Sequence, residues 1–273
     1  MYKHYFILFI IISIKVYSQP LIIAHRGAMA YAPENTIAAF KLAVELGADA
    51  IELDLRQTKD EIPVAIHDAT INKTTNGEGN VVNLTLAELK LLDAGSWFDS
   101  KFNTETIPTL QEVINILTDS VLLFIEFKEG NETYPGIEEN VISLVRENKI
   151  ENQTILKSFD LKVLQRLRKL APDLQLLYVY TFHVPWLDMI IDRGITYGSI
   201  FNIDVDYLQP HRILLSESFV KAAQSRGYKI VSWGVDNEEA ILESLKFGVN
   251  GIETDYPDKA KEIIEKILNV ERK

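Results

Sequence analysis

The chain has 273 residues, of which 47% are hydrophobic and 25% charged, and its formal net charge is −11. This composition is that of a folded globular protein with a sizeable core and excludes an intrinsically disordered chain. The acidic charge, without any Lys/Arg-rich run, argues against a nucleic-acid partner, because binding to a phosphate backbone needs a basic surface. The absence of cysteine excludes disulfide bonds, thiolate metal sites and a cysteine nucleophile.

Residues 1–18 are typical of a secretory signal peptide. A positively charged start precedes the apolar run 5–12, and Ser18 offers a small residue at a cleavage site. Lys15 interrupts the apolar stretch, which is therefore poorly suited to crossing a bilayer with about 20 apolar residues. We expect export to the periplasm or the exterior, with residues 19–273 as one mature domain that has no stable membrane span. An uncleaved anchor is the alternative.

Beyond this segment, short apolar runs alternate with amphipathic stretches, which predicts alternating strands and helices. The predicted barrel strands are Leu21–Ala24, Ala50–Leu55, Val121–Phe127, Thr154–Ser158, Gln175–Tyr180, Tyr197–Phe201, Lys229–Gly234 and Gly251–Thr254. The predicted helices are Thr36–Leu46, Leu110–Leu117, Ile137–Asn148, Leu161–Leu170, Val184–Asp192, Glu217–Arg226, Glu238–Phe247 and Asp258–Leu268. About eight such units predict an α/β fold of the (β/α)₈ TIM-barrel type. An open doubly wound sheet is the alternative, although no Gly-rich dinucleotide or phosphate-loop motif supports it.

The interval from about residue 68 to 107 breaks the alternation. It follows an additional predicted strand, Ile62–Ile66, and contains a cluster of turn-forming residues and a short helical piece at Thr85–Leu92. Because long structured insertions are commonly functional, we expect it to overhang the barrel mouth. Its aromatic pair, Trp97 and Phe98, either forms the core of the insertion or contacts the substrate.

The first predicted strand ends at a His-Arg-Gly triplet. His25 and Arg26 directly follow the apolar run, and Gly27 permits a sharp turn of the backbone. In parallel α/β proteins, ligands bind at the carboxyl ends of the strands. A titratable group beside a permanent cation indicates an anionic substrate; a histidine that caps or packs against a loop is the alternative.

Two neighbouring strands carry carboxylates where a buried strand would normally be apolar. Glu52 and Asp54 lie two residues apart and therefore project from one face of their strand. Glu126 and Lys128 repeat this spacing on the next barrel strand. Like charges so close together repel unless a cation lies between them. Three carboxylates predict one divalent cation, Mg²⁺ or Ca²⁺ and possibly Mn²⁺, rather than zinc.

His67 follows the additional strand and can reach the same mouth as His25. Two histidines beside an oxygen-ligated metal suit cleavage of a phosphodiester, since one accepts a proton from the nucleophile and the other donates one to the leaving oxygen. Arg26 and Lys128 would neutralise the phosphoryl oxygens. Sequence neighbours alone suggest that Arg26 lowers the pKa of His25 and that Asp68 raises the pKa of His67.

From Leu21 to the C-terminus, the chain resembles the glycerophosphodiester phosphodiesterase family. The motifs that carry the resemblance are HRG, PENT, IELDLRQTKDEIPVAIHD, TTNGEG, IPTLQEV, FIEFK, VSWGVDN and GVNGIETDYPD, in the family's order and spacing. The resemblance implies a (β/α)₈ barrel with a small insertion after the second strand, which matches the interval at 68–107.

The resemblance also implies roles for individual residues. It makes His25 and His67 the acid–base pair and assigns the metal to Glu52, Asp54 and Glu126. On the substrate side it places Arg26, Lys128 and Trp233, the last at the end of the seventh strand. Lys73 stands where the family usually has arginine. His183, His211 and Glu253 match no catalytic position, and we expect Asp255 to cap a helix.

The implied activity is hydrolysis of a small-molecule glycerophosphodiester to sn-glycerol 3-phosphate and an alcohol. The resemblance implies attack by the glycerol 2-hydroxyl, which gives a cyclic phosphate that water then opens. One alternative is a lysophospholipase D-type phosphodiesterase, for which an apolar groove near Trp97 would be evidence. The other is a non-catalytic protein that binds phosphate or a lipid head group, which would not need the histidine pair.

Overall fold

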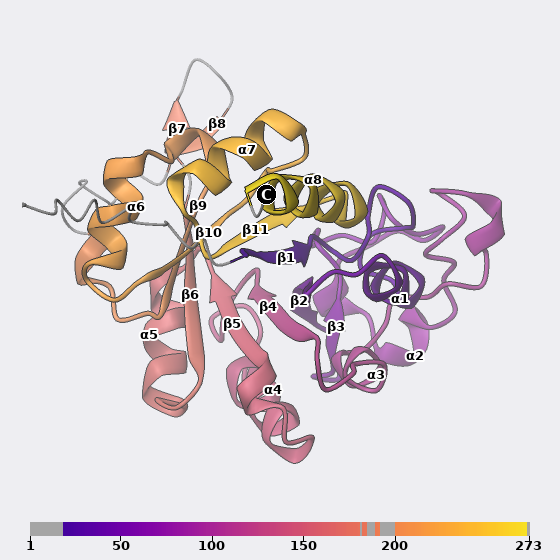
Figure 1. Ribbon diagram of the computed structural model, residues 1–273. Helices are drawn as coiled ribbons and strands as arrows, with labels where there is room; N and C mark the ends of the chain where they lie inside the picture. The colour runs from indigo at the N-terminus through magenta and orange to yellow at the C-terminus, as the bar shows by residue number, and fades with distance from the viewer. Residues whose placement is uncertain (1–18, 181, 185–188, 192–199, 272–273) are drawn as a thin grey trace, which may run out of the picture.

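The computed structural model describes residues 19–180, 182–184, 189–191 and 200–271. Within these ranges, eight parallel strands form a closed barrel with helices around it (Figure 1), so the predicted TIM barrel is confirmed. β1 closes the barrel because Ile23 pairs with Ala50 of β2 and also with Glu253 of β11. In their order around the barrel, the strands are β1 (Leu21–Ala24), β2 (Ala50–Gln57), β4 (Leu122–Phe127), β5 (Thr154–Ser158), β6 (Gln175–Tyr180), β9 (Tyr207–Pro210), β10 (Lys229–Ser232) and β11 (Gly251–Thr254).

The helices between these strands begin at residues suited to capping. Thr36 and Thr109 each accept a hydrogen bond from a backbone N–H of the first helical turn, and Asn237 does the same for a later helix. The helices pack their apolar faces against the outside of the barrel (Figure 1). They are α1 (Ile37–Glu45), α3 (Leu110–Ile114), α4 (Ile137–Glu147), α5 (Leu161–Leu170), α6 (Glu217–Gln224), α7 (Glu238–Phe247) and α8 (Pro257–Glu271).

The segment between β6 and β9 differs from the prediction. The sixth barrel strand is Tyr207–Pro210 rather than Tyr197–Phe201; residues 200–202 form a turn of 3₁₀ helix, and 197–199 lie outside the described residues. An apolar run becomes a strand only where it finds neighbours, and β9 pairs with both β6 and β10.

The helix predicted at Val184–Asp192 is also wrong. Val184 belongs to β7 (Phe182–Val184), which pairs in antiparallel fashion with β8 (Met189–Ile191), while residues 185–188 and 192 are not described. Two features of the sequence favour this outcome. β-Branched residues prefer strands, and a residue that precedes proline, as Val184 does, disfavours helical backbone.

The inside of the barrel has two layers. The lower layer is an apolar cluster of alternate strand residues: Ile23, Ala50, Phe124, Ile155, Leu177, Val179, Tyr207 and Val231. Because successive strand residues face opposite sides, the residues two positions further along also face inward. On four strands these are polar: Glu52, Glu126, Lys157 and Gln209. Glu253 is a fifth, two positions after Gly251, which packs against Ile23 and Val231 of the apolar layer. The interior therefore changes from apolar to charged towards the carboxyl ends of the strands.

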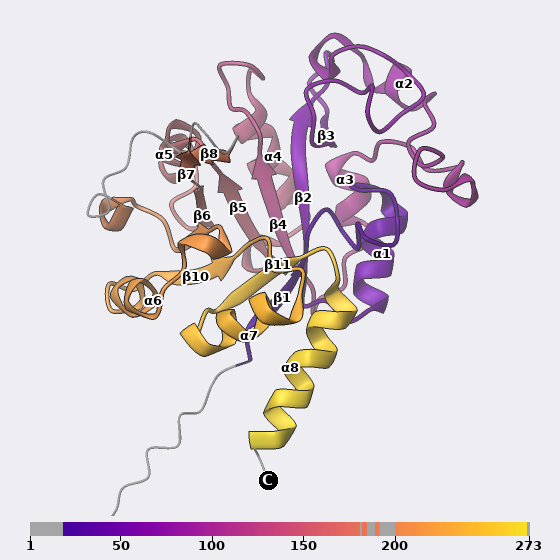
Figure 2. The same ribbon diagram turned by 90° about the horizontal axis from the view of Figure 1, so that it is seen from above.

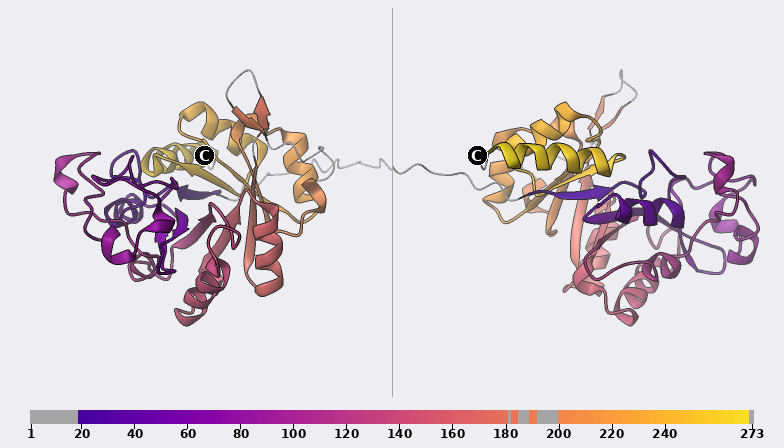
Figure 3. Two further views of the ribbon diagram at one scale, coloured as in Figure 1. Left: turned by 180° about the vertical axis from the view of Figure 1, so that it is seen from behind. Right: turned by 45° about the vertical axis from the view of Figure 1, so that its right-hand side comes forward.

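The insertion lies beyond the carboxyl end of β2 (Figure 2). It begins with β3 (Pro63–Ala65), which pairs in antiparallel fashion with β2, and it contains α2 (Leu86–Leu89). Figure 3 shows it as a lobe on the side of the barrel away from α6. Its own small core consists of Val64, Ile66, Ile71, Val81, Leu89, Ala94 and Ile107. Trp97 and Phe98 lie outside this core with 40% and 36% exposure, so the prediction that they form it is wrong.

Candidate active site

The turn after β1 places His25 and Arg26 at the barrel mouth. Arg26 and Gly27 both have left-handed backbone, with φ of 51° and 82°. A side chain at residue 27 would put its Cβ 2.6 Å from the backbone carbon of Ala39, so glycine lets the turn pack directly against α1. The backbone N–H of Arg26 donates a 2.9 Å hydrogen bond to Glu52 Oε2, which ties the turn to β2.

The three predicted carboxylates meet at one point. Asp54 on β2 is directly opposite Glu126 on β4, and ligand oxygens of Glu52, Asp54 and Glu126 all lie within 4.8 Å of one another. All three side chains are buried. Glu52 Oε1 and Asp54 Oδ1 accept no well-directed hydrogen bond from any residue that the structure describes. Their nearest cations are the ammonium groups of Lys157, 3.0 Å from Glu52 Oε1, and Lys128, 2.9 Å from Asp54 Oδ1. Converging carboxylate oxygens of this kind fit a hard divalent cation.

Cationic side chains surround this trio. Lys128 Nζ lies 2.9 Å from Asp54 Oδ1 and also donates to Glu126. Arg26 Nε lies 3.0 Å from Asp54 Oδ2, so the structure brings both predicted cations to the trio. Burial alone would raise the pKa of Asp54, but Lys128 and Arg26 hold it well below its usual range. Asp54 is therefore held as an anion by its two cationic neighbours.

Asn35 and Glu34 support the same residues from the loop before α1. Asn35 donates to the carboxylate of Asp54 at 2.9 Å and accepts from its backbone N–H at 3.1 Å. Glu34 accepts a 2.9 Å hydrogen bond from Arg26, and Lys73 of the insertion lies 3.4 Å from its other oxygen. The lysine at position 73 therefore still reaches the loop that orients Arg26.

A buried lysine that the sequence analysis missed lies beneath the trio. Lys157 is only 1% exposed, and its Nζ lies 3.0 Å from Glu52, 3.4 Å from Glu126 and 2.8 Å from Glu253. Gln209 donates a second 2.8 Å hydrogen bond to Glu253. Burial raises the pKa of Glu52 to about 7 despite the opposing effect of Lys157. One feature of the sequence could have pointed to Lys157: it lies two residues after an inward-facing apolar residue, as Glu52 and Glu126 do.

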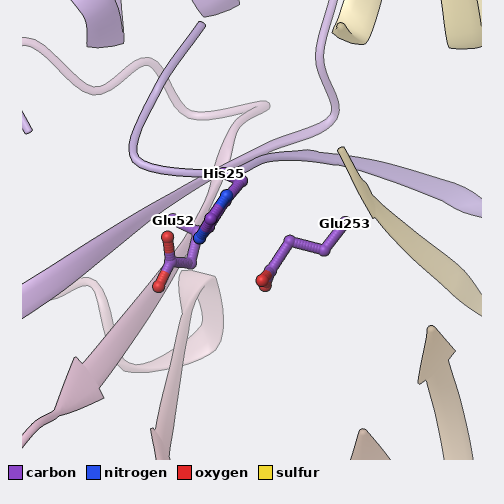
Figure 4. Close-up of side chains that lie close together, drawn as sticks. All are labelled: His25, Glu52 and Glu253. Carbon is purple, nitrogen blue, oxygen red and sulfur yellow. The ribbon is translucent and has the colours of Figure 1, made fainter. Parts of the chain in front are cut away.

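His25 points into this acidic interior. Figure 4 shows its ring beside the carboxylates of Glu52 and Glu253, and their ligand atoms lie within 4.8 Å of one another. Its Nδ1–H donates a 2.8 Å hydrogen bond to Asp255, which gives this residue a partner that the helix-cap prediction did not include. Burial opposes the charged imidazole, but the Asp255 hydrogen bond and the charges of Glu52 and Glu253 raise the pKa of His25 to about 9.

His67 follows β3 and has the opposite shift. Its Nδ1–H donates a 2.6 Å hydrogen bond to Asp68, and its backbone carbonyl accepts one from Arg56 at 2.9 Å. Burial and the charge of Lys128 lower the pKa of His67, although Asp54 and Asp68 act against them. Both neighbours act in the suggested direction, but each net shift is the reverse of what they suggest. Asp255 and two buried glutamates outweigh Arg26 at His25, and burial and Lys128 outweigh Asp68 at His67.

Trp233 follows β10 at the mouth of the barrel. Its ring lies edge-on to His211, with centroids 4.5 Å apart, and 6.4 Å from the ring of Phe159. The indole Nε1 is buried and has no hydrogen-bond partner among the described residues. His211 caps the next 3₁₀ turn by accepting from a backbone N–H. The side chain of His183 lies outside what the structure describes.

A hollow of about 300 Å³ opens beside Lys128, between the loop after β4 and the start of α5. Most of its lining residues are charged or polar: Lys128, Glu129, Gly130, Asn131, Glu132, Thr133, Glu138, Asp160, Lys162, Val163 and Arg166. These side chains suit a polar group that is attached to an anion bound near Lys128.

Known proteins are similar to this chain in sequence and in fold. The sequence model of the glycerophosphoryl diester phosphodiesterase family matches residues 25–259. A glycerophosphodiester phosphodiesterase of Caldanaerobacter subterraneus subsp. tengcongensis is 42% identical over 90% of this chain and 98% of its own. A putative glycerophosphodiester phosphodiesterase of Bacillus subtilis is 40% identical over 87% and 95%. A phosphodiesterase of Oleispira antarctica, solved in complex with the product sn-glycerol-3-phosphate, is 28% identical, with a TM-score of 0.80 over 90% and 97% of the two chains.

Proposed function

The chain belongs to the glycerophosphoryl diester phosphodiesterase family and is a phosphodiesterase of glycerophosphodiesters; we propose that it releases sn-glycerol 3-phosphate with the help of one divalent cation and two histidines. The observation that carries the proposal is the meeting of three buried carboxylates with two imidazoles of opposite pKa shift. The product complex of the Oleispira phosphodiesterase supports the choice of product.

In this proposal, Glu52, Asp54 and Glu126 hold the cation, for which Mg²⁺, Ca²⁺ and Mn²⁺ are candidates. A bound divalent cation would supply Lewis-acid stabilisation of charge on the phosphoryl oxygens. Arg26 and Lys128 add positive charge beside the same oxygens. The indole N–H of Trp233, which has no partner among the described residues, is free to donate to the substrate at the mouth.

The two histidines move the protons. His67, whose pKa is lowered, is neutral near pH 7 and takes the proton from the glycerol 2-hydroxyl as it attacks phosphorus. His25, whose pKa is raised to about 9, is protonated and gives its proton to the oxygen of the leaving alcohol. Water then opens the cyclic phosphate with the roles reversed. Asp255 and Asp68 fix the orientation of the two rings by accepting from Nδ1–H.

The test of this assignment uses single histidine variants and two leaving groups. His25→Ala and His67→Ala should each lose at least about 10²-fold in kcat, the low end for acid–base catalysis, while metal binding is kept. A diester with an activated leaving group needs no acid and should restore His25→Ala only. If the activated diester restored the activity of His67→Ala instead, His67 would be the acid and His25 the base. Near-normal turnover of an ordinary diester by either variant would refute the mechanism.

The hollow beside Lys128 bears on the alternative of a lysophospholipase D-type enzyme. Its charged lining favours a small polar alcohol over an acylated one. A panel of glycerophosphodiesters and lysophospholipids, assayed for released sn-glycerol 3-phosphate and free alcohol, distinguishes the two. We expect turnover of the acylated substrates to be the slower; a preference for them would favour the alternative. A non-catalytic binding role has no support, since the relatives named above are phosphodiesterases.

We also propose export, with residues 1–18 as a cleaved signal peptide and 19–273 as the mature domain. The support is the charged start, the short apolar run and the small residue Ser18. No helix in the described part of the chain is long and apolar enough to span a bilayer. N-terminal sequencing of the purified protein should begin near Gln19. An intact Met1 on a membrane-bound protein would instead identify an uncleaved anchor.

A further inference from the structure

We propose that Lys157 is a fixed internal cation that fills the position beside the metal-binding carboxylates, so that the centre accepts one divalent ion and not two. This inference rests on the proposed role of Glu52, Asp54 and Glu126 as metal ligands. It assigns Lys157 a positioning role in the interior of the barrel, where it contacts neither substrate nor the reacting atoms.

Among the residues that the structure describes, two potential metal-ligand sets occur, and they share Glu52. One is the carboxylate trio, and the other consists of His25, Glu52 and Glu253, whose ligand atoms also lie within 4.8 Å of one another. Many phosphoryl-transfer enzymes hold two cations about 3.5–4 Å apart. A carboxylate that belongs to both sets is therefore where a second ion would be expected.

Lys157 occupies the position beside Glu52 where a second ion would be expected. Its ammonium lies 3.0 Å from Glu52 and 2.8 Å from Glu253, which are both carboxylates of the second set. It also lies 3.4 Å from Glu126 of the first set, so it stands between the two. At 1% exposure the side chain is buried together with these partners. Its positive charge would repel a divalent ion placed between the same oxygens.

Residues of the second ligand set also form hydrogen bonds with other side chains. Gln209 donates to Glu253 Oε2, the same oxygen that contacts Lys157. His25 Nδ1 donates to Asp255, which leaves only Nε2 to face the interior. A buried charge network with each member paired is costly to rearrange, because removing one partner leaves the others unpaired in a poorly solvated place.

The test is the stoichiometry of Mn²⁺ binding to the metal-free full-length enzyme, measured by calorimetric titration and by the electron paramagnetic resonance signal of free Mn²⁺. The wild-type enzyme should bind one ion. Lys157→Met, which keeps an unbranched side chain one atom shorter and removes its charge, should bind two. A wild-type enzyme that binds two ions, or a Lys157→Met variant that binds one or none, would overturn the inference.

A matched pair of variants keeps the test decisive if Lys157→Met does not fold. Glu253→Gln retains Lys157 but leaves more of its charge uncompensated beside Glu52 and Glu126, so affinity for the single Mn²⁺ should fall by about tenfold or more. Lys157→Met combined with Glu253→Gln removes both charges, so it should bind one ion with nearly wild-type affinity. Unchanged affinity in Glu253→Gln would contradict the proposed placement of charge.

The same data separate this inference from the proposed function. A wild-type enzyme that binds no divalent ion would refute both. One ion in the wild-type enzyme and one in Lys157→Met would refute the role of Lys157 alone, and leave the single-cation phosphodiesterase intact.

Discussion

At the scale of single residues, the charge of each histidine depends on residues that are far away in the sequence. His25 is bonded to Asp255, 230 positions away, and faces Glu52 and Glu253. His67 is influenced chiefly by its own burial and by Lys128. Their pKa values therefore move apart, His25 upward and His67 downward, which is the arrangement that an acid and a base need at neutral pH.

These shifts predict a bell-shaped dependence of kcat/KM on pH. Activity should be lost as the pH falls through the lowered pKa of His67, because the base becomes protonated. It should be lost again as the pH rises through the pKa of His25, about 9 in the metal-free protein, because the acid loses its proton. A cation on the nearby carboxylates disfavours both imidazolium ions, so both limbs should lie at lower pH in the loaded enzyme. A flat profile between pH 5 and 10 would contradict the assignment.

The hydrogen bond between His25 and Asp255 can be tested directly. Asp255→Asn removes the negative charge but keeps an oxygen that can accept from Nδ1–H. A charge-assisted hydrogen bond contributes about 1.5–3 kcal/mol, which corresponds to about one to two pH units. The alkaline limb of kcat/KM should move down by about that amount, whereas the acid limb should not. Asp173→Asn, which changes an exposed carboxylate between α5 and β6, is the control and should move neither limb.

At the scale of elements, the turn from β1 to α1 is built around close backbone contact at Gly27. Gly27→Ala should reduce the free energy of unfolding by more than about 2 kcal/mol, because left-handed backbone costs about 1–2 kcal/mol and Cβ would meet Ala39 at 2.6 Å. Gly136→Ala is the control, since Gly136 is also left-handed but has open space around its missing Cβ. Chemical denaturation measures both, and equal losses would contradict the role of the contact.

The insertion is an element with a core of its own, so it should be able to open without the barrel. Leu89 is fully buried in that core, whereas Leu91, two residues further, is 84% exposed. Leu89→Ala should cost about 2–5 kcal/mol of local stability, and Leu91→Ala should change little. Hydrogen exchange should accelerate in residues 68–107 of Leu89→Ala and stay slow in the barrel strands. Equal acceleration in both regions would show that insertion and barrel unfold together.

At the scale of the whole molecule, closure of the barrel concentrates buried charge on the inner face of one end. Glu52, Glu126, Lys157 and Glu253 come from four different strands and meet only because those strands close into a ring. Buried like charges favour unfolding unless they are paired or bind a cation. The metal should therefore act on the stability of the fold as well as on catalysis.

Metal binding should accordingly raise the melting temperature. A ligand that binds only the folded state stabilises it by about 2.7 kcal/mol at a free concentration of 100 times Kd. Addition of Mg²⁺ or Ca²⁺ to the metal-free protein should raise Tm, and a chelator should reverse the gain and abolish activity. Glu126→Gln should lose most of the response, whereas Asp99→Asn, at an exposed carboxylate of the insertion, should keep it. Full activity after metal removal would contradict the proposed cation.

The sequence by itself determined the alternation of strands and helices, because apolar periodicity and proline positions are local properties of the chain. It also singled out His25 and His67, which directly follow apolar strands, and the carboxylate trio, which lies within two strands that would otherwise be apolar. The sixth strand was placed wrongly, at Tyr197–Phe201, because two nearby apolar runs compete and only pairing with β6 and β10 selects Tyr207–Pro210. Tertiary structure alone decided which groups touch.

Lys157, Glu253 and Asp255 were missed or misjudged for the same physical reason. Electrostatic energy depends on distance in space and on burial, and neither follows from adjacency in the sequence. Lys157 is one polar residue in an ordinary strand until β5 is placed between β4 and β6 and across the barrel from β11. The direction of both histidine pKa shifts follows from that closure, which brings charges more than 90 positions apart within 3 Å of each other.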